Sequence, residues 1–490
     1  MTTLRSLTAP VPVPKLLELA DGLANALSRR HGRVGLHGGL CPDAVLIDTD
    51  GELTILDPHR PLPQRALYAA PEQSGRLSRD VDERADLYAV GVLLYELATG
   101  KRPFSTARGA ELVRAQLTDA PPPPSALRRD LPPGLDGVLG MLLARLPEDR
   151  YQSPRGLLAD VRTCHEELTA TGGIGPFPTG RADVPARLAF TGRLYGRRSR
   201  LAQLGAARDR VARDGGVELV PVSSDPGLGK TALLGAFSDA VVMDGGWVAR
   251  TGFEVTEAAP YAALARLLAD LLEHLTMRCG GDVSGWRPRL IEDLGGTAPV
   301  LTEFVPELGE LLSGDTPRYP TPPPGVRAEA LLRLGIRRLL STVSSAEAPL
   351  VLILDDLHRA DADSVDVLRY VLSDPESNGL LVAVALRPKE IPEPVAALLR
   401  ELGPVRSGGT LNLRPLPDSA LTELLADTLR AGMREAGDLA RVVADKTGSR
   451  PLAVGEFLRG LRDNRLLLFD QRADAWRWEQ IGRASCRGRV

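Results

Sequence analysis

A short loop at residues 224–231 carries the residue types best suited to chemistry in this chain. It reads Ser-Asp-Pro-Gly-Leu-Gly-Lys-Thr, follows an apolar run over residues 217–222 and precedes a helical pattern that begins at Thr231. The loop fits the phosphate-binding pattern G-x-x-x-x-G-K-[ST] at every fixed place except the first, where Ser224 replaces glycine. Taken alone, it could also be an ordinary turn between a strand and a helix.

The chemistry of such a loop depends on its glycines and on its last two residues. The glycines let the backbone curl so that its N–H groups face phosphate oxygens, and the positive end of the following helix adds to that field. The Lys230 ammonium would neutralise the outer phosphates, and the Thr231 hydroxyl would bind magnesium. The loop therefore predicts a site for ATP and Mg²⁺, with contacts from Ser224, Gly227, Gly229, Lys230 and Thr231.

A pair of carboxylates ends a second apolar run. Residues 350–354 are all apolar, as expected of a strand buried on both faces of a parallel sheet, and Asp355 and Asp356 follow at once. Such a pair can hold magnesium through Asp355 and orient the attacking water through Asp356. The alternative, two acids that only solubilise a strand end, is disfavoured by the combination with Lys230 and Thr231.

A third apolar run, residues 380–386, ends in Arg387. An arginine at the end of a strand beside the phosphate-binding loop is placed to contact the γ-phosphate of a nucleotide. A solvated arginine at a strand end would fit the same position. His358 and His165 have no partner in the local pattern and are interpreted as structural residues.

The elements that must position these residues follow an α/β pattern. Strand-like runs alternate with helical periodicities, which predicts a parallel sheet followed by a helical lid. The strand-like runs are residues 217–222, 247–250, 350–354, 380–386 and 411–416, and the helical ones are 261–275, 326–343, 418–429 and 438–446. Residues 306–324 are predicted to be a loop. Pro221 conflicts with its central strand, because proline has no N–H for the ladder.

Two further motifs of this region resemble those of the AAA-like and STAND classes of NTPase. Residues 193–197 read Arg-Leu-Tyr-Gly-Arg, which is similar to the adenine-side motif of these classes, and residues 447–452 resemble the turn of their helical lid. The resemblance implies that Tyr195 and Gly196 lie beside the base. A helix N-terminus with chance basic residues is the alternative reading of residues 193–197.

Composition limits the classes of function. With 60 basic and 63 acidic residues among 490, no net charge favours nucleic acid or an anionic membrane as a partner. The four cysteines show no metal-binding spacing, the first 15 residues contain no apolar run, and the longest apolar runs are only strand-length. We therefore expect a cytoplasmic protein without a membrane span, a nucleic-acid partner, a zinc site or a disulfide framework.

The N-terminal third carries a series of short motifs in a specific order. They are His-Gly-Gly-Leu-Cys-Pro-Asp-Ala at 37–44, Leu-Asp-Pro-His at 56–59, Ala-Pro-Glu at 70–72, Asp-Leu-Tyr-Ala-Val-Gly at 86–91 and Asp-Arg-Tyr at 149–151. In this order they resemble the catalytic loop, metal-binding segment and helices of the larger lobe of a Ser/Thr protein kinase. The resemblance implies that Arg150 pairs with Glu72.

The departures from the kinase pattern remove its chemistry. After His37, the position of the catalytic aspartate falls on Gly39, that of the phosphate-side lysine on Cys41 and that of the metal-binding asparagine on Ala44. Asp57 is the one catalytic carboxylate that remains, and the smaller lobe is absent. Glycine and alanine supply neither a proton acceptor nor a metal ligand, so the lobe is predicted to be a pseudokinase.

The order of these parts resembles the front half of large bacterial multi-domain sensor kinases. The resemblance implies signalling partners, including a histidine kinase module in a longer chain. The expected fold is multi-domain, a mainly α kinase C-lobe followed by an α/β P-loop NTPase with a parallel sheet and a helical lid. The expected boundaries are 1–168 for the kinase-like lobe, 169–190 for a linker, 191–405 for the NTPase, 406–480 for the lid and the start of a next domain, and 481–490 for a non-native tail.

The predicted function is that of an ATP-binding signalling protein, most simply an ATPase. A non-hydrolysing adaptor and an active Ser/Thr kinase fragment are the alternatives. A DNA-binding regulator would need a helix-turn-helix after residue 480. The last ten residues resemble a translated sequencing adapter, and a genuine basic tail is the other reading of them.

Overall fold

The computed structural model describes residues 2–56, 65–105, 109–184, 188, 190, 192–254, 260–313, 327–406, 409–470 and 475–478, with residues 403–406 described by their backbone alone. The chain divides into two compact units. Unit 1 comprises Met1–Tyr195, Pro417–Ser449 and Ala453–Val490, and unit 2 comprises Gly196–Leu416 and Arg450–Leu452. Residues 481–490, interpreted above as a tail, lie outside the described residues.

The N-terminal part of unit 1 is mainly helical. Its helices are α1 (Val13–Arg33), α2 (Arg84–Thr99), α3 (Gly109–Thr118), α4 (Pro124–Leu127), α5 (Pro133–Leu142) and α6 (Pro154–Thr171), joined by the 3₁₀ turns η1 (Leu4–Ser6), η2 (Pro42–Ala44), η3 (Arg65–Leu67), η4 (Pro71–Ser74) and η5 (Pro147–Asp149). Leucines and alanines of α1 recur at steps of three and four residues and are buried, so α1 packs one apolar face against the core. A small antiparallel sheet consists of β1 (Thr2–Thr3), β2 (Val45–Ile47) and β3 (Leu53–Ile55), with a turn that contains Gly51 between β2 and β3.

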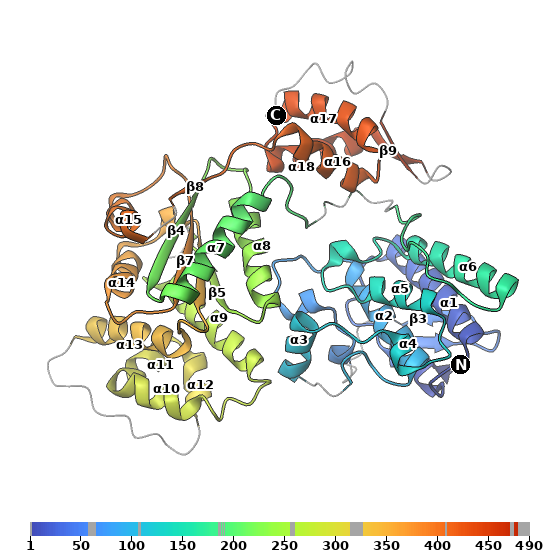
Figure 1. Ribbon diagram of the computed structural model, residues 1–490, viewed down its shortest axis with the longest axis horizontal. Coiled ribbons are helices and arrows are strands. Elements are labelled where there is room, and N and C mark those ends of the chain that lie inside the picture. The colour runs from blue at the N-terminus through green and yellow to red at the C-terminus, as the bar shows by residue number, and fades with distance from the viewer. Residues whose placement is uncertain are drawn as a thin grey trace. The chain divides into compact units, whose positions relative to one another are not determined.

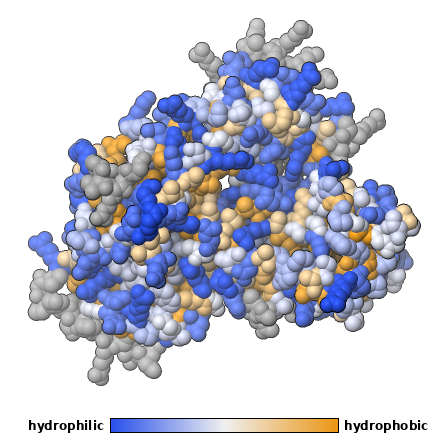
Figure 2. Space-filling view, in the orientation of Figure 1, coloured by the Kyte–Doolittle hydropathy of each residue, from blue (hydrophilic) through white to orange (hydrophobic). Residues whose placement is uncertain are grey.

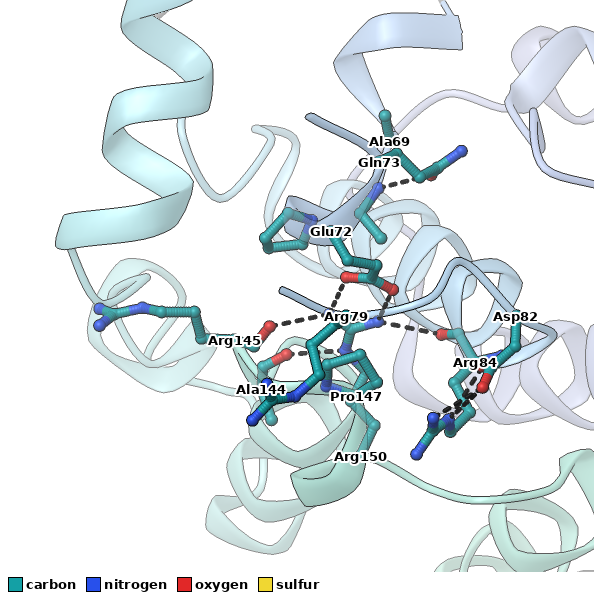
Figure 3. A network of polar contacts seen from close by, with 12 residues as sticks. Ala69, Glu72, Gln73, Arg79, Asp82, Arg84, Ala144, Arg145, Pro147 and Arg150 are labelled. Carbon is teal, nitrogen blue, oxygen red and sulfur yellow. Dashed lines mark hydrogen bonds and ion pairs between the residues drawn. The ribbon is translucent and has the colours of Figure 1, made fainter. Parts of the chain in front are cut away.

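A buried ion pair ties η4 to the turn after η5. The Arg150 guanidinium is 0% exposed and donates from Nη1 and Nη2 to the two carboxylate oxygens of Glu72, each at 2.7 Å. The same guanidinium donates to the carbonyl oxygens of Ala144, Arg145 and Arg84, as Figure 3 shows. The predicted pairing of Arg150 with Glu72 is confirmed.

Residues 169–171 of the predicted linker are the last residues of α6, and residues 172–184 contain neither helix nor strand but pack against the preceding helices. The Gly134 N–H donates to the Ile174 carbonyl at 3.1 Å, and the Ile174 side chain is buried. Asp183, 1% exposed, accepts hydrogen bonds from the Gln152 N–H and from the Ser153 hydroxyl at the start of α6. The segment is therefore an ordered strap on this lobe.

Unit 2 is built on a five-stranded parallel sheet in the order β5-β6-β7-β4-β8. Its strands are β4 (Val217–Ser223), β5 (Trp247–Gly252), β6 (Leu350–Asp355), β7 (Leu380–Leu386) and β8 (Leu411–Asn412). Helices α7 (Arg198–Asp214) and α8 (Lys230–Met243) lie on one face, and α14 (Ala362–Ser373) and α15 (Glu393–Arg406) lie on the other (Figure 1). Because all strands run in one direction, the ends of β4, β6 and β7 meet at one edge of the sheet.

The register of β4 explains how the sheet tolerates Pro221. The Leu413 N–H donates to the Ser223 carbonyl, which therefore faces β8. Residues two apart on a strand direct their backbone groups to the same side, so the Pro221 nitrogen also faces the β8 side. There β8 pairs only with Val222 and Ser223, so the missing N–H breaks no ladder bond.

The sequence prediction fails for the start of residues 306–324. Residues 306–312 form α12 (Pro306–Leu312), which packs in a helical group with α9 (Ala262–Arg278), α10 (Arg287–Leu294), α11 (Ala298–Phe304) and α13 (Ala328–Val343), with the turn η6 (Gly295–Thr297) between α10 and α11. The predicted loop is wrong here because proline is compatible with the first turn of a helix and because Leu308 and Leu312 are buried. Residues 314–324 lie outside the described residues.

The C-terminal part of unit 1 contains the predicted lid helices. The predicted ones are α16 (Asp418–Leu429) and α17 (Met433–Thr447), which begins five residues before its predicted start at 438. Helix α18 (Pro451–Asp463) was not predicted, and an antiparallel hairpin of β9 (Leu467–Asp470) and β10 (Ala475–Trp478) follows it. Hydrophilic and apolar residues are interspersed over the surface in view in Figure 2. Among the residues that the structure describes, no helix combines the length and apolar character needed to cross a bilayer.

Candidate nucleotide-binding site

The loop after β4 has the backbone geometry of a phosphate-binding nest. Gly227 and Gly229 have φ angles of 77° and 89°, in the left-handed region that glycine adopts most readily. At Gly227 a Cβ atom would also lie 3.2 Å from the Leu452 side chain. Both glycines are therefore needed for the path of the loop into α8, and Ser224 before them anchors it through an N–H bond to the Leu386 carbonyl.

Lys230 is the first residue of α8 and its side chain folds back over the loop. Its Nζ donates to the carbonyl oxygen of Ser224 at 3.0 Å and to the Ser224 hydroxyl at 3.3 Å. Burial lowers the pKa of Lys230, and the nearby Asp356 carboxylate opposes that effect. Ser224, which replaces the first glycine of the pattern, therefore contributes two acceptors for this ammonium.

Thr231, in the first turn of α8, and Asp355, the last residue of β6, come together at the sheet edge. The Thr231 hydroxyl donates to Oδ2 of Asp355 at 2.6 Å, and the other carboxylate oxygen accepts the N–H of Asp356 at 3.0 Å. Strand β4, which leads into the loop before Thr231, and strand β6, which ends in Asp355, are separated in the sheet by β7. A hydroxyl and a carboxylate that converge in this way are hard oxygen ligands of the kind that Mg²⁺ prefers.

Asp356 stands in a group of charged side chains. Its φ angle is 51°, which is rare for a residue other than glycine, and it precedes the turn η7 (Leu357–Arg359). Its carboxylate lies 3.7 Å from Nη2 of Arg387, at the end of β7, and 3.6 Å from Nη1 of Arg359. The structure therefore brings Asp356 and Arg387, the two predicted catalytic residues, into one ion-pair cluster.

Arg197 contacts the loop and was not singled out from the sequence. Its buried Nη2 donates to the carbonyl oxygen of Leu228, between the two loop glycines, at 3.2 Å, and also to the carbonyl of Arg414. Burial lowers the pKa of Arg197. The signal in the sequence was its place as the last residue of the Arg-Leu-Tyr-Gly-Arg motif.

The predicted lid turn touches the same loop. Gly448 and Ser449 both have positive φ, at 60° and 54°, and the chain then enters α18. The Leu452 N–H, in the first turn of α18, donates to the Gly227 carbonyl at 3.2 Å. The Leu452 backbone thus contacts the phosphate-binding loop directly, and Nη2 of Arg450 lies 3.9 Å from the Asp225 carboxylate of that loop.

The two residues predicted to lie beside the base are placed in different units. Gly196, in unit 2, has a φ of 62° and leads into α7. Tyr195, in unit 1, donates its hydroxyl to the Asp427 carboxylate on α16 at 2.8 Å. The contact of Tyr195 and Gly196 with a base stays a prediction.

Of the four predicted kinase positions, His37, Gly39 and Ala44 are described, and they belong to unit 1. The backbone N–H of His37 donates to Asp86 at 2.7 Å, Ala44 is buried in η2, and Asp57 lies outside the described residues. A Cβ atom at Gly39 would lie 2.9 Å from Cδ of Arg65. Arg65 thus fills the space into which a longer side chain at Gly39 would point.

The comparisons with known proteins agree with a nucleotide-binding unit. Residues 193–384 match the family described as AAA ATPase domain. The chain is 29% identical over 331 residues to hybrid signal transduction histidine kinase G of Dictyostelium discoideum, covering 64% of this chain and 9% of that protein. It is 36% identical over 163 residues to serine/threonine-protein kinase Pkn1 of Myxococcus xanthus, covering 29% and 23%, respectively.

A third relative is serine/threonine-protein kinase PknL of Mycobacterium tuberculosis, 29% identical over 221 residues, which are 42% of this chain and 54% of that protein. The chain thus spans less than two thirds of the length of each of these relatives. The family match supports an ATPase domain of the AAA type over residues 193–384, and the relatives carry the names of signalling kinases.

Proposed function

We propose that this chain is an ATP-binding signal-transduction protein in which a P-loop ATPase switch is coupled to a catalytically degenerate kinase-like lobe. The observation that carries the proposal is the meeting of Thr231 and Asp355 at 2.6 Å, beside the Lys230 ammonium. A lysine, a hydroxyl and a carboxylate at one sheet edge match the needs of a magnesium-bound triphosphate. The AAA ATPase domain match over these residues supports the same assignment.

The phosphates would be held by the chain's own loop. Lys230 would exchange its Ser224 acceptors for phosphate oxygens, and the backbone N–H groups around Gly227 and Gly229 would donate to the triphosphate. Arg197, hydrogen-bonded to the Leu228 carbonyl, adds positive charge behind the loop and fixes its peptide planes. Tyr195 and Gly196 are proposed to contact the base.

Thr231 and Asp355 are the residues that fit a magnesium ion. Their oxygens already converge, and the donor set contains only hard oxygen atoms. When bound, magnesium would neutralise charge on the phosphate oxygens.

Asp356 is proposed to orient the water that attacks the γ-phosphate. Its carboxylate lies 3.7 Å from Nη2 of Arg387 and 3.6 Å from Nη1 of Arg359. Arg387 would turn from Asp356 to the γ-phosphate, and the presence or absence of that phosphate would then change the ion pairs at the end of β7.

The kinase-like lobe is proposed to serve as a docking or sensing module without phosphotransfer. Gly39, Cys41 and Ala44 supply no catalytic base and no hard metal ligand, whereas Glu72 and Arg150 keep a fully buried pairing that supports the lobe. The relatives' names support a place in a larger signalling kinase, with a histidine kinase module or other signalling domains as partners.

A nucleotide-dependent adaptor without turnover is the second candidate. The specific observation in its favour is that the Asp356 carboxylate faces three basic side chains, those of Arg387, Arg359 and His358. These side chains compete with a water molecule for the carboxylate oxygens. An active Ser/Thr kinase fragment is disfavoured by Gly39.

The proposal is tested by binding and turnover in two variants of the full chain. Lys230→Ala removes a charged donor whose hydrogen bonds contribute about 1.5–3 kcal/mol, so ATP affinity should fall about ten- to a hundredfold in titration calorimetry. Asp356→Ala should keep ATP binding and abolish steady-state phosphate release. The matched control is Lys389→Ala, an exposed lysine on the segment after β7, which should leave both measurements unchanged.

Unchanged ATP affinity in Lys230→Ala would contradict the assignment of the site. Binding without phosphate release in the unmodified chain would favour the adaptor.

A further inference from the structure

Two basic side chains share the same pair of carboxylates at the end of β7. Arg387 lies 3.7 Å from Asp356 and 3.4 Å from Glu390. His358, on η7, lies between the same two acids, with Nδ1 3.8 Å from Oδ1 of Asp356 and Nε2 3.4 Å from Oε2 of Glu390. The two bases therefore approach the acids from η7 and from the segment after β7.

His358 is buried, and its two ring nitrogens form no hydrogen bonds with the described residues. Its side chain is 2% exposed, and neither Nδ1 nor Nε2 has a hydrogen-bond partner among the described residues. Leaving a polar group buried and unpaired costs about 1–3 kcal/mol. A histidine kept in this state beside a predicted catalytic carboxylate points to another state of the site in which both nitrogens are satisfied.

We propose that His358 is a positioning residue for the ATPase reaction. When Arg387 turns to the γ-phosphate, His358 binds a proton and becomes the partner of both Asp356 and Glu390. The inference rests on the proposed function, because it needs a triphosphate at the loop. A protonated imidazole has two N–H donors, one for each carboxylate. The proton comes from the solvent, and no covalent bond changes.

The charges around the ring give the direction of the effect. Asp356, Arg359, Arg387 and Glu390 face His358, and burial holds its pKa below the ordinary value. Arg387 and Arg359 lower the pKa further, whereas Asp356 and Glu390 raise it. Neutralising Arg387 with a phosphate oxygen removes one lowering effect and leaves both carboxylates in place, so the ring becomes more basic.

Arg387 is suited to this exchange. Its distances to both acids exceed those of a close hydrogen bond, and its Nε has no hydrogen-bond partner among the described residues. Its guanidinium can therefore leave without breaking a short contact. His358 would then keep the Asp356 carboxylate oriented toward water after its arginine partner has moved.

The test is proton uptake on nucleotide binding by the full chain. Titration calorimetry with ATPγS and magnesium is repeated near pH 7 in two buffers of different ionisation enthalpy, and then with ADP. We expect uptake of up to about one proton per ATPγS bound and none with ADP, which lacks the γ-phosphate. His358→Gln should still bind ATPγS but show no buffer dependence, whereas the control His165→Gln should behave like the unmodified chain.

The outcomes separate the inference from the function on which it rests. Absence of ATPγS binding would refute the proposed function. Binding without buffer dependence, equal uptake with ADP, or uptake that persists in His358→Gln would overturn the role of His358. If His358→Gln does not fold, histidine Cε1 resonances of the unmodified chain with ATPγS and with ADP decide the question, because one imidazole should become protonated with ATPγS alone.

Discussion

Replacing Glu72 with glutamine should strongly destabilise the N-terminal lobe. Glu72→Gln keeps the shape of the side chain but removes the charge that neutralises the buried Arg150 guanidinium. The three carbonyl oxygens around that guanidinium remain, yet they carry only partial charge. Leaving a buried charge without its partner costs about 3–5 kcal/mol.

Hydrogen exchange measured by mass spectrometry is the appropriate assay, because a chain with two units does not unfold in a single step. Amides in α2, whose Arg84 carbonyl accepts from Arg150, should exchange about 150-fold faster or more. Peptides from β6 and β7 in unit 2 should be unchanged. The matched control is Glu18→Gln, which removes an exposed ion pair with Lys15 and should cost less than about 1 kcal/mol.

A second substitution tests the cause. Arg150→Met in the Glu72→Gln background removes the uncompensated charge, so the double variant should lose less stability than the sum of the two single losses. If Glu72→Gln and Glu18→Gln changed exchange in α2 to the same small extent, the buried pair would not hold this lobe together and the reasoning would be refuted.

Two further predictions concern the strap and the lobe. Burial raises the pKa of Asp183 to about 6, so the stability contributed by its protonated form is complete below about pH 4 and is lost as the pH rises through about 6. Asp183→Asn should therefore protect the amides around Gln152 from hydrogen exchange by about 2–3 kcal/mol near pH 7.5 and have no effect near pH 4. Equal protection at both pH values would contradict this. The Lys230→Ala variant incubated with radiolabelled ATP should transfer no label to any protein, because Gly39 supplies no catalytic base. Labelled protein in that preparation would exclude a degenerate kinase lobe.

Several features could be predicted from the sequence because their chemistry is local or their order is specific. The strand, loop and helix around Lys230 follow from an apolar run, two glycines and a helical pattern within about twenty residues. The acids after β6 and the arginine after β7 follow from buried strands that end in charged residues. The pairing of Glu72 with Arg150 followed from the resemblance, and the structure places them in contact.

Other features depended on the arrangement of distant segments. Three features could not be predicted, because each depends on which chain segment lies beside another. They are the contact of Arg197 with Leu228, the placement of His358 between Asp356 and Glu390, and the position of Pro221 where no ladder hydrogen bond is lost. Sequence reasoning treated His358 as isolated, since its partner Glu390 comes from a loop on the far side of a helix and a strand.

The sequence alone thus determined which residues could do the chemistry, because glycine torsions, lysine charge and carboxylate oxygens are properties of single residues. The tertiary structure decided which of them act together. The order of strands in the sheet, with β7 between β4 and β6, brings Thr231 within hydrogen-bond distance of Asp355 and brings Arg387 close to Asp356. That order results from packing the apolar faces of the strands and helices, a property of the whole unit.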